Sequence, residues 1–456
     1  MLLVGHSEIL SNKTSAVSAN YMAQYQTKSE DNLPLSNIEK DAEYGFFIES
    51  PTLNNTLLWT DSKPTSIATS FYVLGRYLKN FFIPHPLIYF YGYNQIPLVN
   101  FANWQVLLSI FIYISLIFFA LFFLHRSPPI AFAIIFYLIS ISLYSQLIVY
   151  VPDTMADRYF FMASLPLSLL TVLLLAKILR IDFTVQKEHF LAANHKIYLS
   201  VFMLIFILIL PTYAYATKQR NSVWKTNLSL FEHDLKYMEN CARAHYYYAN
   251  EMLQTYHLLE DKKRIAIAEK IAYHFSRSIE ISDKSFASYL NLIKFYIGHN
   301  MFGQANNILQ LFLKSYPDTF HANHLLGYYY FYKKDYTKAV QALEKAYEKA
   351  PKNQDNFFFL GWAYYNSGNY EKAVKILEKG IAFYPSYQEY FLALSDIHFG
   401  YGNYEKAQKV LEMFIESYPN AIKCYEKLVY QLTERGEQQA ANRYQRFLEQ
   451  NIKKRN

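Results

Sequence analysis

One spacing dominates the C-terminal part of this chain: residues of the same type return every 34 positions. The positions that keep this step are Pro317, Pro351, Pro385 and Pro419; Ala305, Ala339, Ala373, Ala407 and Ala441; Tyr336, Tyr370 and Tyr404; and Gly327 and Gly361. A constant period of this length indicates stacked repeats, each of which contacts only its neighbours. Each unit is expected to hold two antiparallel helices, because small residues allow close approach and proline cannot continue a helix.

These features resemble the tetratricopeptide signature, which combines this period with small residues at fixed positions and a closing proline. Regular units are predicted to start near Phe286, Phe320, Gln354, Gln388 and Ile422. An irregular unit is predicted to start near Ala242, with its extra residues at about 254–263 between its two helices. We therefore predict an α-solenoid of about six units over residues 242–456, preceded by a linker at residues 218–241.

The first helices of the regular units are predicted to line a groove. The positions that would face it are His321, His324, Tyr328, Phe331, Tyr332, Asp355, Phe358, Trp362, Tyr365, Asn366, Glu389, Leu392, Asp396 and Phe399. Two interpretations of this aromatic surface stay open: it binds an extended peptide or a sugar by stacking, or it packs neighbouring repeats together. His321 and His324 have no Cys or carboxylate at a clear metal-ligand spacing, so no metal site is predicted.

Four apolar stretches precede the repeats, at about residues 105–124, 130–147, 161–179 and 197–215. Each approaches the roughly 20 residues that a helix needs to cross a hydrocarbon core of roughly 30 Å, and none has an ionisable residue in its middle. Backbone groups inside a bilayer must bond to one another, so these stretches are expected to be helices. Four such runs in succession favour a membrane domain of four transmembrane helices at residues 101–217 over buried helices of a soluble protein.

Loop charges predict the orientation of these spans. The basic residues in or beside the first and third connecting loops are Arg126, Lys177, Arg180, Lys187 and Lys196. Because cytoplasmic loops carry an excess of Lys and Arg, both loops are predicted to be cytoplasmic. With four spans, both ends of the chain then lie on the other side. The repeat domain is therefore expected in a periplasm or lumen, next to a bacterial inner membrane or an equivalent membrane.

Two segments before the first span have their own patterns. Residues 1–64 are polar and aperiodic, which is typical of a non-cytoplasmic loop or tail. Residues 65–100 are predicted to be an interfacial segment. Within them, residues 66–83 place apolar side chains at helical spacing close to Arg76 and Lys79, which suits a helix lying in the interface better than a span.

Several kinds of chemistry are not indicated. The formal net charge is +7, but the only basic block is the short tail 453–455, so nucleic-acid binding is not predicted. Cys241 and Cys424 lie in different units and suggest neither a disulfide framework nor a metal site. There is no Gly-rich phosphate loop, His-Glu-x-x-His, Cys-x-x-Cys or Gly-x-Ser-x-Gly motif in the sequence, so no cofactor is predicted.

Three segments resemble a single family. Residues 80–97 precede the first span, the run from Asp157 to Pro166 (Asp-Arg-Tyr-Phe-Phe-Met-Ala-Ser-Leu-Pro) opens the third, and residues 224–249 lead into the repeats. Together they resemble the transmembrane and tetratricopeptide-repeat O-mannosyltransferases and their bacterial relatives. These are multi-spanning glycosyltransferases of the GT-C type that use a polyprenyl-phosphate sugar. The resemblance covers roughly residues 50–250, and the repeats extend it.

The resemblance implies more helices than these four and acidic catalytic residues in the first non-cytoplasmic loop. This chain begins downstream of that loop, so no catalytic residue is assigned and an enzymatic activity stays open. The resemblance also implies a role for Arg158, whose guanidinium could pair with the phosphate of a lipid-linked donor and stabilise charge on the leaving phosphate. The competing interpretation is an interfacial Arg paired locally with Asp157 or Asp153.

Two functional hypotheses follow. In the first, the chain is the C-terminal part of a membrane glycosyltransferase, and the repeats present the acceptor protein. In the second, it is a non-enzymatic membrane scaffold whose repeats recruit partner proteins outside the cytoplasm.

Overall fold

The computed structural model describes residues 55, 57, 60, 62–92, 94–148, 151, 153–178, 195–256 and 260–455. Within these ranges the chain is helical and contains no strand, only an isolated bridge between Tyr91 and Met155, so the predicted all-α class is confirmed. Contacts divide the chain into an N-terminal unit within Glu49–Ser315 and a C-terminal unit within Tyr316–Asn456. Most of the predicted polar tail, and Arg180 and Lys187 of the orientation argument, lie outside the described residues.

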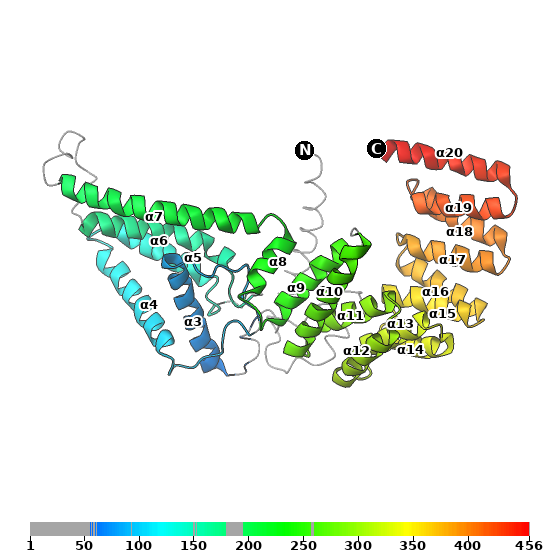
Figure 1. Ribbon diagram of the computed structural model, residues 1–456, viewed down its shortest axis with the longest axis horizontal. Helices are drawn as coiled ribbons and strands as arrows, with labels where there is room; N and C mark the ends of the chain where they lie inside the picture. The colour runs from blue at the N-terminus through cyan, green and yellow to red at the C-terminus, as the bar shows by residue number, and fades with distance from the viewer. Residues whose placement is uncertain are drawn as a thin grey trace. The chain divides into compact units, whose positions relative to one another are not determined.

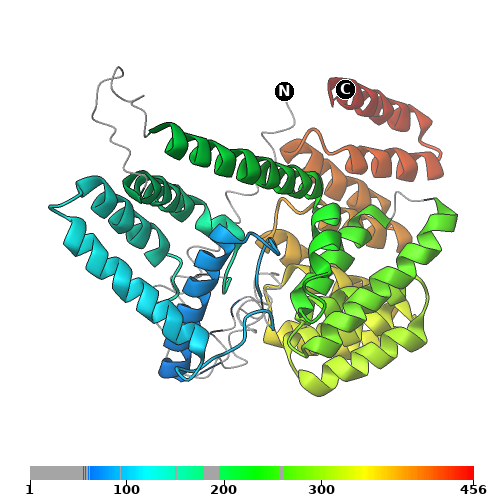
Figure 2. The same cartoon turned by 60° about the vertical axis from the view of Figure 1, so that its left-hand side comes forward.

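The apolar stretches of the N-terminal unit form helices. The elements are α3 (Lys63–Phe82), α4 (Trp104–Phe123), α5 (Pro128–Ser142), η3 (Asp157–Phe160), α6 (Phe161–Ile178), α7 (His195–Val223) and α8 (Asn227–Leu235). Helices α3, α4, α5 and α6 contact one another in that order, as Figures 1 and 2 show. The single long helix α7 contains the fourth predicted stretch and has Pro211 inside it. Its Tyr213 hydroxyl donates to the carbonyl of Phe82, 2.9 Å away, and so joins α7 to the end of α3.

Two helices in the described ranges are long and apolar enough to cross a membrane: α4, and the continuous segment Asp157–Ile178 formed by η3 and α6. Helix α5 is apolar but shorter, with 15 residues. Only 22 % of the apolar window of α4 and 28 % of that of Asp157–Ile178 is buried. A core helix of a soluble protein would instead be covered by its neighbours on most sides.

Helix α3 buries one face and exposes the other. Small and apolar residues such as Ala68, Val73 and Leu74 are buried on its inner side. A Cβ at Gly75 would lie 3.2 Å from the Cβ of Ser109, so α3 and α4 approach closely at this point. Ile67 and Phe82 remain exposed. The predicted position of this segment at a membrane interface stays a prediction.

Two helical hairpins complete the N-terminal unit. They are α9 (Ala242–Tyr256) with α10 (Asp261–Ile281), and α11 (Phe286–Gly298) with α12 (Phe302–Ser315). Their first helices begin at the residues where the sequence places unit starts. The longer second helix α10, with 21 residues, takes up part of the extra length of the irregular unit.

The C-terminal unit is a stack of four more hairpins, drawn from yellow-green to red in Figure 1. They are α13 (Phe320–Tyr332) with α14 (Tyr336–Lys349), α15 (Gln354–Asn366) with α16 (Tyr370–Phe383), α17 (Gln388–Gly400) with α18 (Tyr404–Ser417), and α19 (Ile422–Glu434) with α20 (Gln438–Arg455). Each first helix contacts the first helix of the next hairpin, which makes one continuous surface of α13, α15, α17 and α19.

The repeated small residues explain this packing. A Cβ at Gly327 would lie 2.5 Å from Cγ of Leu343, and one at Gly361 would lie 2.7 Å from Cγ of Leu377. Each leucine belongs to the second helix of the same hairpin and is fully buried. The glycines therefore allow the two helices to approach until the leucine touches backbone.

Candidate functional site

The first candidate site surrounds Arg158 in η3, at the start of the apolar helix α6. The guanidinium forms an ion pair with Asp153 and donates a hydrogen bond to the carbonyl of Tyr89, 3.2 Å away. It also lies 5.0 Å from the centre of the Tyr159 ring. The Tyr159 hydroxyl donates to the same Asp153 carboxylate at 3.2 Å. The local pairing with Asp153 that the sequence left open is therefore present, yet the Arg158 side chain is 51 % exposed.

Asp157 is not the partner of Arg158. Its Oδ1 accepts a hydrogen bond from the Tyr91 hydroxyl at 3.4 Å. Asp157 and Arg158 are thus neighbours in sequence that contact different parts of the segment around residues 89–91. The Arg158 guanidinium stays close to the surface, where an anionic group can reach it.

A buried ion pair holds this segment in place. Arg220 at the end of α7 pairs with both carboxylate oxygens of Asp234 in α8, at 2.5 and 3.0 Å, and the two side chains are 14 % and 1 % exposed. Asp234 also accepts a hydrogen bond from the backbone N–H of Tyr89 at 2.8 Å. The carbonyl of Tyr89 accepts a hydrogen bond from Arg158. The Arg220–Asp234 ion pair, which holds the backbone N–H of Tyr89, therefore helps to fix the position of the first candidate site. No spacing in the sequence pointed to this pair, because its partners lie 14 positions apart on different helices.

The second candidate site is the first-helix face, which comprises the outward positions of α13, α15, α17 and α19. It does not include two of the predicted residues. His321 and His324 are only 4 % and 2 % exposed. The His324 ring stacks on Phe320 at 5.5 Å and meets the edge of Phe359 from the next first helix at 5.8 Å. The prediction that these histidines face a groove is corrected, because both side chains are buried and Phe359 of α15 covers the His324 ring. Burial lowers the pKa of His321 to about 3, which keeps that ring neutral.

The remaining predicted residues of α13 are partly covered. The rings of Tyr328, Phe331 and Tyr332 lie 5.0, 5.8 and 6.4 Å from that of Phe359. Tyr332 nevertheless remains 44 % exposed. These rings therefore pack against the next repeat and still present one side to solvent, and the interpretation that the surface binds a ligand stays a prediction.

On α15 the predicted residues form a ridge. Trp362 lies between Phe358 and Tyr365, with ring centres 6.5 and 5.9 Å away. Asp355 and these three aromatic side chains are half-buried, and Asn366 is exposed. The ridge presents a carboxylate, aromatic rings and an amide along one helix.

On α17 the predicted carboxylates are paired across to α19. Glu389 accepts from Lys423 at 2.8 Å, and Asp396 pairs with Lys427 at 3.0 Å. Leu392 and Phe399 of the same helix are half-buried. A shallow hollow of about 430 Å³ lies beside these pairs, and it is lined by Leu392, Lys423, Glu426, Lys427 and Tyr430.

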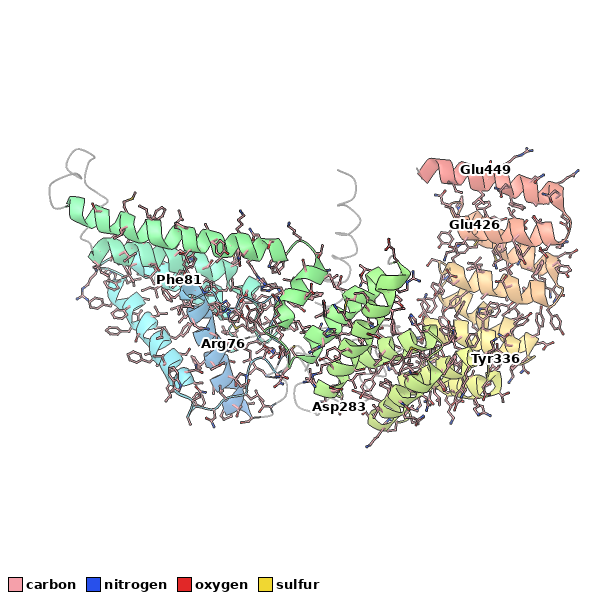
Figure 3. All side chains as sticks on the ribbon, viewed as in Figure 1. Arg76, Phe81, Asp283, Tyr336, Glu426 and Glu449 are labelled. Carbon is pink, nitrogen blue, oxygen red and sulfur yellow. The ribbon has the colours of Figure 1, made fainter. Side chains whose placement is uncertain are left out.

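The α19 residues of this hollow were missed at the sequence level. Adding one period to Glu389, Leu392 and Asp396 gives Lys423, Glu426 and Tyr430, so the spacing alone was enough to find them. Figure 3 labels Glu426 on α19. Lys427 follows Glu426 on that helix, and its ion pair with Asp396 of α17 holds it beside the hollow.

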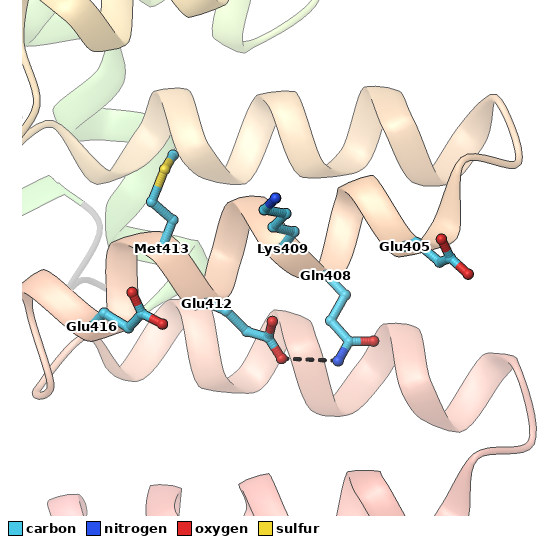
Figure 4. Close-up of a pocket in the computed structure, with 6 residues that line it drawn as sticks. All are labelled: Glu405, Gln408, Lys409, Glu412, Met413 and Glu416. Carbon is cyan, nitrogen blue, oxygen red and sulfur yellow. Dashed lines mark hydrogen bonds between the residues drawn. The ribbon is translucent and has the colours of Figure 1, made fainter.

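Another open hollow, of about 600 Å³, lies on the second helix α18 (Figure 4). Its lining residues are Glu405, Gln408, Lys409, Glu412, Met413 and Glu416. Glu412 already accepts hydrogen bonds from Gln408 at 2.9 Å and from the Tyr444 hydroxyl at 2.6 Å. All six residues come from one helix, so this is an open helix face rather than an enclosed site.

Metal ligation finds no support in the described ranges, where no group of three or more His, Cys, Asp and Glu side chains is arranged to hold an ion. Cys241 and Cys424 are both buried. Burial raises the pKa of the Cys424 thiol to about 11, which keeps it protonated at neutral pH.

Three tetratricopeptide-repeat family models match the chain, at residues 296–354, 330–394 and 389–421. No curated protein matches it. Solved structures that resemble it include MamA, with 20 % identity, a TM-score of 0.31, and coverage of 36 % of this chain and 96 % of that one. A thermophilic TPR protein from Thermus thermophilus has 14 % identity, a TM-score of 0.34, and coverage of 41 % and 99 %.

A further similar structure is YrrB, described as a TPR protein with an unusual peptide-binding site. It has 16 % identity and a TM-score of 0.31, and the match covers 43 % of this chain and 96 % of YrrB. The C-terminal part of this chain thus contains tetratricopeptide repeats, as the spacing predicted.

Proposed function

We propose that this chain is a membrane-anchored protein whose tetratricopeptide repeats bind a protein or peptide partner outside the cytoplasm. The observation that carries the proposal is the presence, in one chain, of helices with an exposed apolar surface and of repeats with an exposed mixed surface. Lipid is the solvent that suits the first, and a polypeptide ligand suits the second.

The apolar surface is large. Helix α4 exposes Leu107, Leu108, Phe111, Ile114, Ile117, Phe118, Phe119, Leu121 and Phe122. Helices α5 and α6 add Phe132, Ile135, Ile139, Phe161, Met162, Leu165, Leu169 and Val172. Contiguous apolar patches on soluble monomers rarely exceed a few hundred Å². Burial in hydrocarbon gains roughly 25 cal/mol for each Å² of this surface, which supports membrane insertion of α4–α6.

The repeats supply the binding surface. Their first helices contact one another in series and present half-buried aromatic rings beside ion pairs on one continuous face. Repeat solenoids use such faces for extended ligands, because successive units place side chains at regular intervals. We place this face in a periplasm or lumen, on the basis of Arg126 in the first predicted cytoplasmic loop and Lys177 at the edge of the other.

Two measurements test this proposal on the full chain. The protein is expected in the membrane pellet after washing with alkaline carbonate, and to leave it only with detergent. A chain that appears in the carbonate supernatant contradicts the anchoring. A reporter fused after Asn456 is expected to be active only outside the cytoplasm, and cytoplasmic activity overturns the orientation.

A second function is favoured by one specific observation at Arg158. Its side chain is half exposed despite its ion pair, and it lies where the apolar helix α6 begins. We propose that it binds the phosphate of a polyprenyl-phosphate sugar, as the resemblance to the O-mannosyltransferases implies. There a guanidinium would stabilise the charge that develops on the phosphate as the sugar leaves.

The test compares Arg158→Ala and Arg158→Lys in membranes that contain the complete transferase. Transfer from a polyprenyl-phosphate sugar is expected to fall most in the Ala variant and to recover partly in the Lys variant, which keeps the charge. Arg126→Ala is the matched control, because Arg126 lies in another loop and stacks on Phe122. Equal transfer by wild type and Arg158→Ala removes the proposed role.

A further inference from the structure

The first-helix face differs in charge from the chain as a whole. Helices α13, α15, α17 and α19 together carry two lysines and five carboxylates, a net charge of −3, whereas the whole chain has +7. The carboxylates are Asp355, Glu389, Asp396, Glu426 and Glu434. Of the three histidines on these helices, His324 is buried, and burial lowers the pKa values of His321 and His398, so the rings of these two are neutral at neutral pH. The face is therefore negative on a positive protein.

Part of this negative charge is neutralised and part is not. Lys423 and Lys427 pair with the carboxylates of α17. Asp355 and Glu426 have no ion pair among the described residues, so each can accept a cation without breaking an existing ion pair. Asp355 matters most here, since it lies on the same helix as the aromatic ridge.

The aromatic ridge of α15 supplies a second group that can bind a cation. Trp362 is two helical turns from Asp355 on α15, which brings both side chains to the same side of the helix. Tyr332 on α13 and Tyr430 on α19 are 44 % and 57 % exposed. Aromatic faces attract the ammonium of Lys and especially the guanidinium of Arg. A carboxylate and an indole along one helix thus make a site for a cationic side chain.

We propose that the first-helix face binds an extended, cationic peptide segment, with an Arg or Lys side chain over Trp362 and close to Asp355. This inference rests on the proposed partner-binding function and specifies the chemistry of the partner. An extended conformation fits because the face crosses four first helices that contact one another in order. An acidic segment is disfavoured, because it would meet a surface of the same sign.

The test uses the full chain in nanodiscs and three fluorescent twelve-residue peptides. They repeat Arg-Gly-Ser, Gln-Gly-Ser or Glu-Gly-Ser. The Arg peptide is expected to bind most tightly and to weaken as salt is added. Trp362→Ala is expected to weaken it roughly three- to thirtyfold, the range that cation–π contacts carry. Asp355→Asn should do the same to the Arg peptide and leave the Gln peptide unchanged.

The control variant is Glu378→Gln, which removes an exposed carboxylate from the second helix α16. It is expected to leave binding of the Arg peptide unchanged. If the Arg and Gln peptides bind equally and both still depend on Trp362, the proposed charge selectivity is overturned, although the first-helix face still binds peptide. Tighter binding of the Glu peptide, or equal losses in Glu378→Gln and Asp355→Asn, also overturns it. The carbonate wash tests membrane anchoring independently of peptide binding. A failure of the proposed anchoring can therefore be distinguished from a failure of the proposed peptide selectivity.

Discussion

Gly361 offers a direct test of how the repeats pack, because its missing side chain leaves the space that Leu377 occupies. In Gly361→Ala the new Cβ would lie 2.7 Å from Cγ, 2.9 Å from Cδ2 and 3.2 Å from Cδ1 of Leu377. Such overpacking typically costs about 1–3 kcal/mol. The gain in helix propensity from Gly to Ala offsets roughly 0.8–1 kcal/mol of it. We therefore expect a net loss of about 0–2 kcal/mol.

The sign of the effect is expected to depend on Leu377. In a Leu377→Ala background the clash is gone and only the propensity gain remains, so the same Gly361→Ala change should stabilise by up to roughly 1 kcal/mol. Leu377→Ala alone should cost about 2–5 kcal/mol, because that side chain is fully buried.

The cycle consists of the wild type, Gly361→Ala, Leu377→Ala and the double variant. Hydrogen exchange of the α15 and α16 amides in the full-length protein measures the stability of this hairpin in each of them, since local protection reports local stability. An equal change in protection on Gly361→Ala in both backgrounds would show that the clash with Leu377 does not determine the effect. Gly303→Ala is the matched control, because a Cβ there meets no atom within 4 Å, and it should not reduce protection.

Two further predictions concern the N-terminal unit. Arg220→Ala should destabilise this unit by about 3–5 kcal/mol, because it leaves the buried carboxylate of Asp234 without its cation; thermal unfolding in detergent measures this, and adding Asp234→Asn should recover part of the loss. Acidification should loosen the α9–α10 hairpin, where His245 Nδ1 lies 2.8 Å from His274 Nδ1. Burial lowers the pKa of His245, and it lowers that of His274 from 6.5 to about 4. Because the folded hairpin holds both rings neutral, their contribution to its stability is complete above pH 6.5 and is lost as the pH falls through about 4. Hydrogen exchange of α9 and α10 between pH 7 and 4 tests this, and His274→Gln should flatten the profile; an unchanged profile contradicts the assignment.

Burial is the main reason that this pair resists protonation, because it penalises the charged form of either ring. The Nε2–H of His245 donates to the carbonyl of Glu239 at 2.9 Å, so its Nδ1 is left to accept from Nδ1–H of His274. A proton added to Nδ1 of His245 would break this hydrogen bond unless His274 moved its own proton from Nδ1 to Nε2. The charged groups near the pair are Lys270, Arg277, Glu239 and Glu280. The two cations oppose protonation, and the two carboxylates favour it.

The sequence alone was enough for the repeats and their helix starts. The period repeats side chains one unit at a time, and a hairpin of this kind depends mainly on contacts within itself and with its neighbours. Gly361 and Leu377 lie 16 positions apart in one unit, so their contact is implied by the register. The apolar stretches were visible for a similar reason, since helix formation in such a run depends on local composition.

Only the tertiary structure decided which side chains remain accessible. A period predicts the side of a helix on which a residue lies, but not how much of that side the next helix covers. His321 and His324 are both buried, His324 against Phe359 of α15, whereas Trp362, one period after Tyr328, stays partly exposed. Arg158 likewise has two candidate partners nearby in sequence, and the folded loop brings Asp153 to it because Asp157 faces Tyr91 instead. Contacts between elements depend on how whole helices approach, which no local pattern of residues records.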